Sequence, residues 1–414
     1  MRASRGRRTW ARRTLTTILV LVLVVVVPVG GYLGFAGFRR AQPITLPVPT
    51  GSYPVGRTLF DWTDHGRTDP LAPQPGLPRE LSVWLWYPAA REAASHPAPY
   101  APGNWGQLHL TGLAGLGESS FDAVRDHSLD DIGVAAGRFP IVVLEPGLGF
   151  SAPQYTTLAE NLASHGYLVA GVTPTYSANL TVIHGQAVHS TTAGNPQEVL
   201  NSPDPDSAPV AAVSNRLVAE WADDAHFTAA QVATLDRAGP FAGHVDATRT
   251  AYIGHSFGGA ASLEACRTDR NCAAAADLDG TEFGPVVRTG LSKPMMLLAS
   301  QDSCVTGTCD PTNVTERANL ATARTLLAAS AGPTWCYQIE GMLHFNFSDY
   351  AAYYLAAPVR HLVALGPING DLGLTITNAY LTAFLDHTVK SQPQPLLTGQ
   401  STPYPQVRAQ HVPH

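Results

Sequence analysis

The chain has 414 residues, of which 45% are hydrophobic and 14% are charged, and its formal net charge at pH 7 is −6. This composition is typical of a folded globular protein and excludes a disordered or low-complexity chain. The length is sufficient for one large domain with additional segments.

The N-terminus combines a basic stretch with a long apolar run. Residues 2–13 contain six arginines and no acidic residue, and an apolar run from Leu15 to Phe38 ends at Arg39-Arg40. About 20 apolar residues suffice to cross a bilayer, and arginines before the run favour an N-terminus that stays inside. We therefore predict that residues 1–40 anchor the chain in the cell membrane, with the catalytic domain outside the cytoplasm. A cleaved signal peptide and a secreted protein are the alternative.

Charge is distributed unevenly along the chain. Residues 1–40 contain eight arginines and no lysine, aspartate or glutamate, and the remainder has 32 acidic residues against 18 basic ones. Such an acidic surface argues against binding to nucleic acid or docking on anionic lipid. The expected membrane contact is therefore the N-terminal segment alone, and nothing in the sequence indicates an oligomeric state.

All five cysteines lie in the second half of the chain. The close pairs Cys266/Cys272 and Cys304/Cys309 predict two small surface disulfides and leave Cys336 over. Disulfides require an oxidising compartment, which an exported chain reaches. Zinc is the rival interpretation, but no C-x-x-C or paired-histidine spacing accompanies the cysteines, so we expect no metal.

The first half of the globular part begins with a lead-in and continues as strand, helix and strand. Residues 41–76 are rich in proline and glycine and are expected to be a linker. Strands are predicted at 80–88, 138–145 and 167–172, and a helix at 155–165 between the last two. A strand–helix–strand order predicts a right-handed parallel crossover.

The second half contains a polar segment and then regular alternation. Residues 176–210 are polar and proline-containing, and with the amphipathic helix expected at 213–235 they form a cap-like insertion, 176–245, that should cover or line a site. Further strands are predicted at 273–278, 294–300 and 335–340, a last helix at 373–389, and a proline-rich tail at 393–414. We expect one α/β domain over residues 77–392, with a mostly parallel sheet and helices on both faces.

The hexapeptide Gly-His-Ser-Phe-Gly-Gly at 254–259 carries the strongest indication of chemistry. It follows the strand-like run 250–253 and opens the alanine-rich, helix-like run 260–265. This context is that of the nucleophile elbow of α/β-hydrolases, in which a serine is raised on a strained turn between neighbours without Cβ atoms. We therefore predict that Ser256 is the nucleophile, against the alternative of a glycine-rich turn that contains serine by chance.

A serine nucleophile requires a base, and histidine suits this role because its pKa lies near 7. The order along the chain in this fold is serine, acid, histidine. His344, in a loop after the last predicted strand, has the right position. His361 lies in an apolar, helix-like stretch and is expected to pack, and His255 is expected to pack or to hydrogen-bond locally.

The remaining site residues follow from the ends of predicted strands. Asp279 and Asp302 each end a strand after the elbow, and the residue pattern leaves both open as the acid. An oxyanion hole needs two backbone N–H groups, which we expect from Phe257 and from Leu148 in the loop after strand 138–145.

The same loop raises a competing interpretation. Residues 147–152 fit the pattern G-x-G-x-x-A between a strand and a helix, as in dinucleotide-binding sites. That fingerprint also needs an acid at the end of the second strand to hold the ribose, and residues 171–175 contain none. We therefore expect no organic cofactor.

These motifs together resemble a known family. They are W-Y-P-A at 86–89, P-G-L-G at 146–149, L-A-S-H-G-Y at 162–167, G-H-S-F-G-G at 254–259, L-D-G at 278–280 and H-F-N-F at 344–347. Over residues 55–408 the chain resembles the platelet-activating-factor acetylhydrolase-like (lipoprotein-associated phospholipase-like) serine esterases. The resemblance implies Asp279 rather than Asp302 as the acid, and calcium-independent hydrolysis of short or oxidised acyl esters. Pro146 departs from the His-Gly that commonly opens the family's oxyanion loop, and segment 176–210 matches no family pattern.

The expected function is that of a serine carboxylic-ester hydrolase acting through an acyl-enzyme. The resemblance implies short-chain or lipid-like acyl esters, as for an acetylhydrolase or phospholipase, so the expected partner is a small-molecule or lipid ester. Two alternatives remain open: a polyester or cutin hydrolase, and a catalytically silent hydrolase fold that serves as a binding module of the cell envelope.

Overall fold

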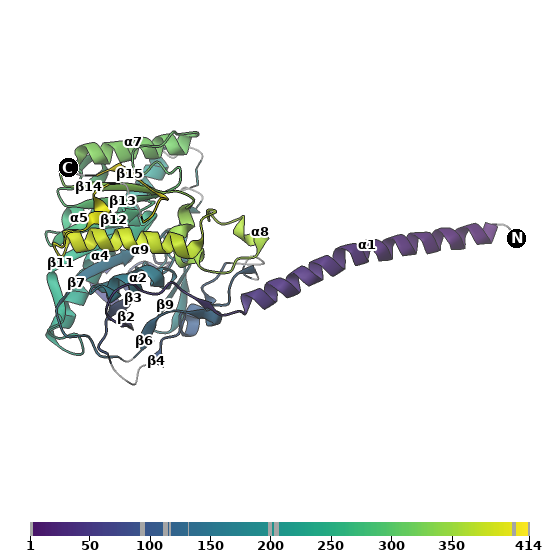
Figure 1. Cartoon of the computed structure of the whole chain (residues 1–414), viewed down its shortest axis with the longest axis horizontal. Coiled ribbons are helices and arrows are strands. Elements are labelled where there is room, and N and C mark those ends of the chain that lie inside the picture. The colour runs from purple at the N-terminus through teal and green to yellow at the C-terminus, as the bar shows by residue number, and fades with distance from the viewer. Residues whose placement is uncertain are drawn as a thin grey trace.

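The computed structural model describes residues 3–91, 96–110, 115, 117–130, 132–197, 201–202, 207–399 and 403–412. Within these residues, a long N-terminal helix projects from a domain built on one large sheet (Figure 1). Parts of the predicted segment 176–210, at 198–200 and 203–206, lie outside the described residues.

Six neighbouring parallel strands form the centre of the sheet. In spatial order they are β14 (Thr334–Ile339), β13 (Met295–Ser300), β12 (Cys272–Leu278), β11 (Val245–His255), β7 (Phe139–Glu145) and β8 (Leu168–Thr173). Every residue of β7, β8 and β13 is buried. Continuous apolar runs of this kind are typical of parallel strands covered on both faces, so the predicted mostly parallel sheet is confirmed.

Antiparallel strands extend the sheet at its edges. At one edge β15 (Val407–His411) pairs with β14, and at the other β3 (Pro78–Pro88) pairs with β8 and β2 (Val55–Thr68) pairs with β3. The described part of the sheet is completed by β6 (Ser128–Asp130) and β4 (His96–Pro97). Two short pairs lie outside it: β1 (Ile44–Thr45) with β5 (Val124–Arg125), and β9 (Leu180–Ile183) with β10 (Gln186–His189).

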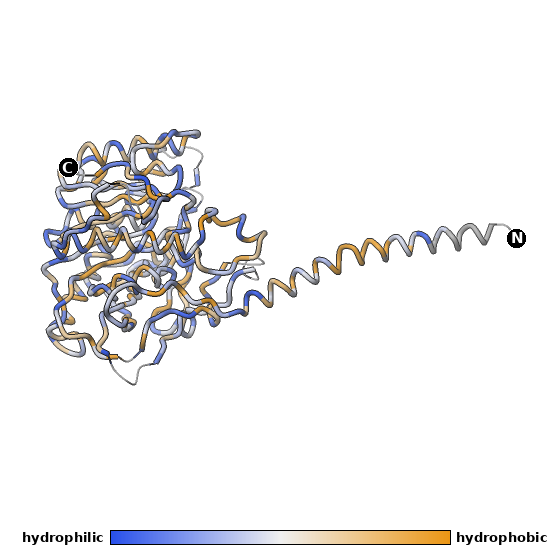
Figure 2. Tube along the Cα trace, in the orientation of Figure 1, coloured by the Kyte–Doolittle hydropathy of each residue, from blue (hydrophilic) through white to orange (hydrophobic). Residues whose placement is uncertain are grey.

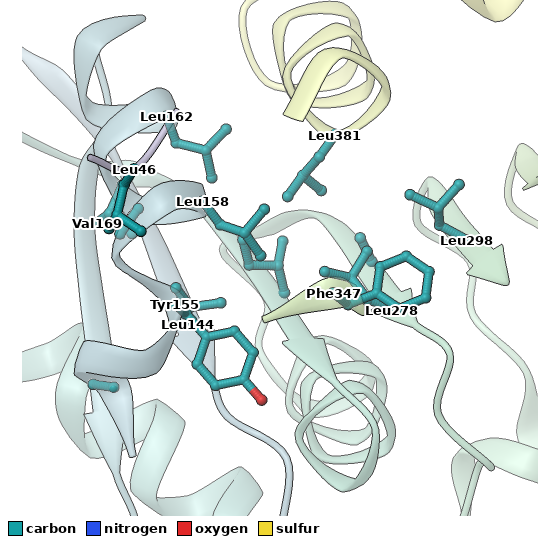
Figure 3. Close-up of a cluster of buried hydrophobic side chains, with 14 of the residues drawn as sticks. Leu46, Leu144, Tyr155, Leu158, Leu162, Val169, Leu278, Leu298, Phe347 and Leu381 are labelled. Carbon is teal, nitrogen blue, oxygen red and sulfur yellow. The ribbon is translucent and has the colours of Figure 1, made fainter. Parts of the chain in front are cut away.

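Helices cover both faces of the sheet, as predicted. The α-helices of the described residues are α1 (Ala3–Arg40), α2 (Thr156–Ser164), α4 (Ala208–Thr234), α5 (Phe257–Thr268), α6 (Val286–Thr289), α7 (Val314–Ala329), α8 (Ala357–Arg360) and α9 (Gly370–Thr388). Leu158 of α2 and Leu381 of α9 share one buried cluster with Leu144 of β7, and Figure 3 shows these side chains converging. Alternate residues of the same strands face a second cluster built with α4, α5 and α7.

Helix α1 leaves the domain and exposes its apolar side chains. Residues 13–40 of α1 are long and apolar enough to cross a membrane, and none of the most apolar window is buried against the domain (Figure 2). Only its last turns touch the domain, where Ala36 is buried and the Arg40 carbonyl accepts a hydrogen bond from the Ser120 N–H at 3.0 Å. This length and composition are shared by membrane anchors and signal sequences.

Two strands of the large sheet lie where the sequence analysis expected a linker and a tail. Strand β2 comes from the 41–76 lead-in, and β15 comes from the 393–414 tail. Neither has the continuous buried run of a central strand, because β2 becomes half-buried or exposed after its first residues and only Val407 of β15 is buried. These outer strands, covered on one face, therefore lacked the continuous apolar pattern from which the central strands were predicted.

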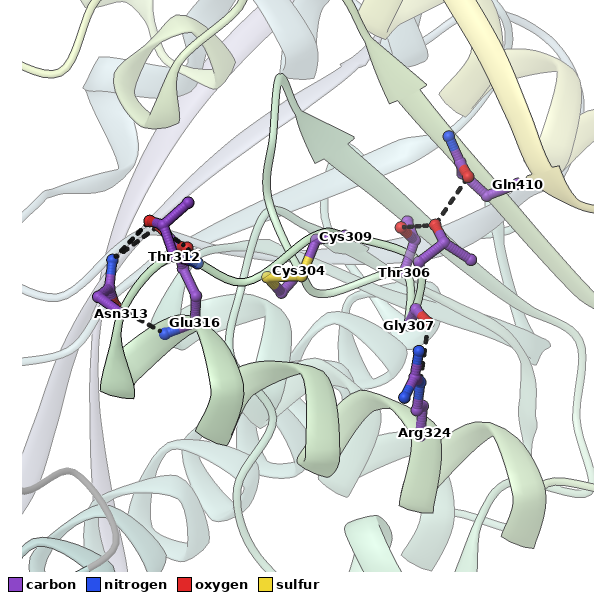
Figure 4. The surroundings of a disulfide bond; sticks show 10 residues. Cys304, Thr306, Gly307, Cys309, Thr312, Asn313, Glu316, Arg324 and Gln410 are labelled. Carbon is purple, nitrogen blue, oxygen red and sulfur yellow. Dashed lines mark hydrogen bonds between the residues drawn. A yellow bond between two sulfur atoms is a disulfide. The ribbon is translucent and has the colours of Figure 1, made fainter.

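The two predicted disulfides are present. Cys266–Cys272 joins the end of α5 to the start of β12, and Cys304–Cys309 closes the loop after β13 (Figure 4). Cys336 is a buried free thiol. The expectation of a surface disulfide is wrong for the first pair, since Cys266 and Cys272 are each 1% exposed, whereas Cys309 of the second pair is half-buried between exposed residues. The first pair is covered because β12 begins beneath the helix layer.

Candidate active site

Ser256 lies on a tight turn between β11 and α5. Its backbone has φ +56° and ψ −124°, a conformation that residues with a Cβ atom rarely adopt. A Cβ atom on Gly258 would lie 2.3 Å from the Pro146 carbonyl oxygen, and one on Gly254 would lie 2.2 Å from the Gly258 backbone. The turn is therefore possible only with glycine at these positions, as the motif predicted, and it presents the serine at the N-terminus of α5.

Three predicted site residues meet at this turn. His344 begins the 3₁₀ helix His344–Phe347 after β14, and Asp279 directly follows β12. The Nδ1 atom of His344 lies 2.8 Å from Asp279 Oδ2, and its Nε2 atom lies 2.9 Å from Ser256 Oγ. The structure thus joins Asp279, His344 and Ser256 in one hydrogen-bonded series.

The Asp279 carboxylate is held in its charged form. Burial, the largest influence, would raise its pKa, but hydrogen bonds and charge from His344 and two hydrogen bonds from Ser300 together lower the pKa below its usual value. Ser300 donates from its N–H at 2.8 Å and from its hydroxyl at 2.9 Å. A charged acceptor requires a proton on His344 Nδ1, which leaves Nε2 free to accept the hydroxyl proton of Ser256.

The other candidates lie apart from this series. Asp302 is exposed, accepts a hydrogen bond from Gln301 Nε2 at 3.1 Å, and in the described part of the chain makes no hydrogen bond to His344. His361 is exposed at the end of α8, so the expectation that it packs in the interior is wrong. Helix α8 is a single short surface turn, in which Val359 rather than His361 faces the core.

The two expected oxyanion donors flank Ser256. Phe257 is the first residue of α5, and the first N–H groups of a helix have no intrahelical acceptor. Leu148 lies in a turn closed by the Phe150 N–H, which donates to the Gly147 carbonyl at 2.9 Å. Among the described residues, none accepts a hydrogen bond from the Leu148 N–H. The Leu148 side chain packs on the cluster that contains Phe257, so both N–H groups belong to the same corner of the fold.

Residues of the 176–210 segment pack directly on the oxyanion loop. The Asn179 N–H donates to the Gly149 carbonyl at 2.9 Å, and the Ser151 hydroxyl donates to the Leu180 carbonyl at 2.6 Å. Tyr176 packs beside Leu148 in the cluster around Phe257. The segment therefore lines the site through the part that the structure describes.

His255 makes the local hydrogen bonds that the sequence analysis anticipated. It is 1% exposed, its Nδ1 atom lies 2.7 Å from the Tyr155 hydroxyl, and its Nε2 atom lies 2.8 Å from the His344 carbonyl. Burial, with the nearby His344, lowers the pKa of His255 to about 3. Sequence reasoning missed Tyr155 and Ser300, because no motif surrounds either residue.

Neither a metal-binding cluster nor a cavity of about 860 Å³ is found at this site within the described residues. The described residues include no group of three or more histidine, cysteine, aspartate or glutamate side chains placed to hold a metal ion. A cavity of about 860 Å³ lies near β15, between Trp335, His387 and residues 393–412, and no residue of the Ser256 series lines it.

Comparison with known proteins gives a consistent result. The family model described as platelet-activating factor acetylhydrolase, isoform II, matches residues 45–203 and 235–394. A probable 1-alkyl-2-acetylglycerophosphocholine esterase of Arthroderma benhamiae is 25% identical over 395 residues, covering 87% of this chain and 92% of that protein. A platelet-activating factor acetylhydrolase of Bos taurus is 22% identical over 358 residues, covering 82% of this chain and 76% of that protein.

A solved structure supports both the fold and the enzyme class. The ferulic acid esterase from Streptomyces cinnamoneus superposes with a TM-score of 0.71 at 29% sequence identity, covering 90% of this chain and 100% of that one. The α/β-hydrolase fold and the family resemblance are thereby confirmed. Because the family model covers most of the chain, and relatives and structural neighbour alike are esterases, the chain belongs to the platelet-activating factor acetylhydrolase (isoform II) family of carboxylic ester hydrolases.

Proposed function

We propose that the chain cleaves carboxylic esters through a covalent acyl-enzyme formed on Ser256. The observation that carries this proposal is the hydrogen-bonded series from Asp279 through His344 to Ser256, with distances of 2.8 and 2.9 Å. It ends at a serine held on a strained turn, directly before Phe257, the first residue of α5. Each residue type has the chemistry that acyl transfer requires at its position.

Acylation begins when Ser256 Oγ attacks the ester carbonyl carbon. His344 Nε2 takes the hydroxyl proton, and Asp279 stabilises the imidazolium that forms. The carbonyl oxygen becomes negatively charged in the tetrahedral intermediate, and the Leu148 and Phe257 N–H groups donate to it. His344 then gives its proton to the leaving alcohol oxygen, and the acyl group remains on Ser256.

Deacylation repeats these steps with water as the nucleophile. His344 Nε2 removes a proton from the water, whose oxygen attacks the acyl carbonyl carbon. The second tetrahedral intermediate collapses, the proton returns to Ser256 Oγ, and the carboxylic acid leaves. No step requires a metal ion or an organic cofactor.

The proposed substrates are esters with short or lipid-like acyl groups. The Arthroderma benhamiae relative is named for a 2-acetylglycerophosphocholine ester and the Bos taurus relative is named an acetylhydrolase, which supports a small acyl group. Esters of aromatic acids are the second candidate, since the structural neighbour is a ferulic acid esterase. Half-buried Phe283 favours this candidate, because its ring packs on Phe257 at a ring-centroid distance of 5.8 Å and leaves an aromatic surface near the oxyanion corner.

The proposed location is the cell membrane, with α1 as a retained anchor and the catalytic domain outside the cytoplasm. The basic residues before the apolar stretch of α1 and its exposed apolar surface support this arrangement. We further propose that residues 77–392 are the catalytic domain and that β2 and β15 complete its sheet from either side.

The decisive experiment compares Ser256→Ala with the wild-type chain in hydrolysis of p-nitrophenyl acetate. We expect Ser256→Ala to lose hydrolysis and labelling by a fluorophosphonate probe, because both require the nucleophilic hydroxyl. Ser292→Ala, which changes an exposed serine outside the site, should keep both. Retained hydrolysis in Ser256→Ala would contradict the proposal, and an unlabelled, inactive wild type would favour the silent binding module.

The acyl group is tested with a panel of esters. Ethyl ferulate, acetyl to octanoyl p-nitrophenyl esters and an acetylated ether phospholipid are compared by kcat/KM. Rates that fall with increasing acyl length support short acyl esters. A higher kcat/KM for ethyl ferulate than for the acetyl ester would instead support the aromatic candidate.

A further inference from the structure

Two buried side chains beneath the Ser256 series take no part in the mechanism described above. Tyr155 is fully buried and His255 is 1% exposed. The Gly147 N–H donates to the Tyr155 hydroxyl oxygen at 2.8 Å, and this hydroxyl lies 2.7 Å from His255 Nδ1. The other ring nitrogen of His255, Nε2, lies 2.8 Å from the His344 carbonyl oxygen. One continuous chain of hydrogen bonds thus runs from the oxyanion loop to the proposed base.

Only one direction of proton donation satisfies this chain. The His344 carbonyl is an acceptor, so His255 Nε2 must carry a proton and donate it. Burial keeps the His255 ring neutral, its pKa being lowered to about 3, so Nδ1 carries no proton and must accept. Tyr155 therefore donates its hydroxyl proton to Nδ1, and its oxygen receives the Gly147 N–H. Every polar atom of both side chains is used, and no alternative tautomer fits.

The two ends of this chain lie at the two groups that act on the substrate. Gly147 immediately precedes Leu148, the proposed oxyanion donor, and a Cβ atom at Gly147 would lie 3.1 Å from His255 Nδ1 and 3.4 Å from the Ser256 Cβ. At the other end the rings of His255 and His344 lie 4.6 Å apart, and the hydrogen bond holds the backbone of His344 itself. Removal of the Tyr155 hydroxyl should therefore alter the positions of both the Leu148 N–H donor and His344.

We propose that Tyr155 and His255 form a positioning relay that fixes the Leu148 donor and the His344 ring relative to Ser256. This inference rests on the proposed function, because it assigns the relay to the same acyl-transfer chemistry. Neither side chain touches the ester. Removing one oxyanion donor outright costs about 10²–10³-fold in kcat in a well-studied protease, so releasing the loop that carries such a donor should cost about tenfold.

The test separates positioning from simple packing. Tyr155→Phe keeps the ring and removes only the hydroxyl. Tyr167→Phe is the matched control, since Tyr167 is equally buried and its hydroxyl donates to Asp386 at 2.9 Å, outside the site. The loss of packing or of one buried hydrogen bond should lower the melting temperature of both variants. Only Tyr155→Phe also breaks the relay, so only this variant should bind the transition state more weakly.

The measurement uses the full chain in detergent. We expect Tyr155→Phe to lower kcat for p-nitrophenyl acetate about tenfold with KM within about twofold, because transition-state contacts rather than ground-state binding are lost. Inhibition by an aliphatic trifluoromethyl ketone, which forms an oxyanion on the serine, should weaken by a similar factor. Tyr167→Phe should change neither. A Tyr155→Phe enzyme with wild-type kcat and inhibition would overturn the relay.

A double-mutant cycle gives an independent check. If Tyr155 and His255 act as one unit, His255→Gln combined with Tyr155→Phe should lose no more activity than the worse single variant. Additive losses would contradict the relay.

Fluorophosphonate titration counts the reactive serines in each variant, so misfolded protein is excluded from kcat. If Ser256→Ala keeps its activity, the proposed function fails. If Ser256→Ala is inactive and Tyr155→Phe is unimpaired, only the relay fails.

Discussion

At the scale of single residues, Asp279 and Asp302 are distinguished by their surroundings rather than by their own backbone. Both follow neighbouring parallel strands and both have a positive φ, +62° and +61°. Only Asp279 receives hydrogen bonds from Ser300 and from His344. The sequence could predict Ser256 and His344 from motif and chain order. The sequence left both aspartates open as the acid, because the assignment depends on which of the two strand ends faces His344.

The acid is tested by comparing Asp279→Asn with Asp302→Asn. We expect Asp279→Asn to lower kcat by about 10⁴-fold, because an amide donates to His344 Nδ1 and imposes the wrong tautomer. Asp302→Asn should stay within about twofold of the wild type. Steady-state hydrolysis of p-nitrophenyl acetate measures both. The reverse order of losses would transfer the role of acid to Asp302.

At the scale of elements, the predictable strands were those buried on both faces. Strands β7, β8, β12 and β13 appear in the sequence as continuous apolar runs, since helices cover both sides of each. Outer strands such as β2 and β15 contain few apolar residues and have one polar face, so their pairing with neighbouring strands decides whether they form. Tyr155 was missed for a similar reason, because its partner His255 lies 100 residues away in sequence.

The disulfide between α5 and β12 should contribute stability without contributing to catalysis. Cys266 and Cys272 are six residues apart, and closing so short a loop stabilises the fold by about 2 kcal/mol through the unfolded state. Cys266→Ala with Cys272→Ala should therefore lower the free energy of unfolding in urea by about that amount and leave kcat nearly unchanged. The double variant Cys304→Ala, Cys309→Ala, which removes the other disulfide, serves as the comparison for both the free energy of unfolding and kcat. A large fall in kcat would mean that this disulfide shapes the elbow.

At the scale of the whole molecule, the fold buries many carboxyl groups. Burial raises the pKa values of Glu145, Glu160, Asp277 and Glu282 well above their usual range, and it raises the pKa of Asp349 to about 7. These groups stay protonated in the folded chain at pH values where the unfolded chain has released its protons. The sequence predicted the α/β architecture that encloses them, but their burial follows from packing that no local pattern reveals.

The stability of the molecule should therefore decrease as the pH rises. For a group whose folded-state pKa is raised, stabilisation is complete below the unfolded-state pKa and is lost as the pH passes the folded-state pKa. His255 acts in the opposite direction, but only below about pH 6.5, where its unfolded form gains a proton. We expect a lower melting temperature at pH 8.5 than at pH 6.5, and a smaller difference in Asp349→Asn. An equal or higher melting temperature at pH 8.5 would contradict this account.

The position of β15 at the edge of the sheet has a consequence for how the protein is made. Strand β14 is synthesised well before its outer neighbour, because α9 and a proline-rich connection come between them. During that interval the N–H and C=O groups along this edge have no partner and can pair with another chain. If α1 directs export as proposed, the sheet can be completed at this edge only after residues 407–411 have crossed the membrane.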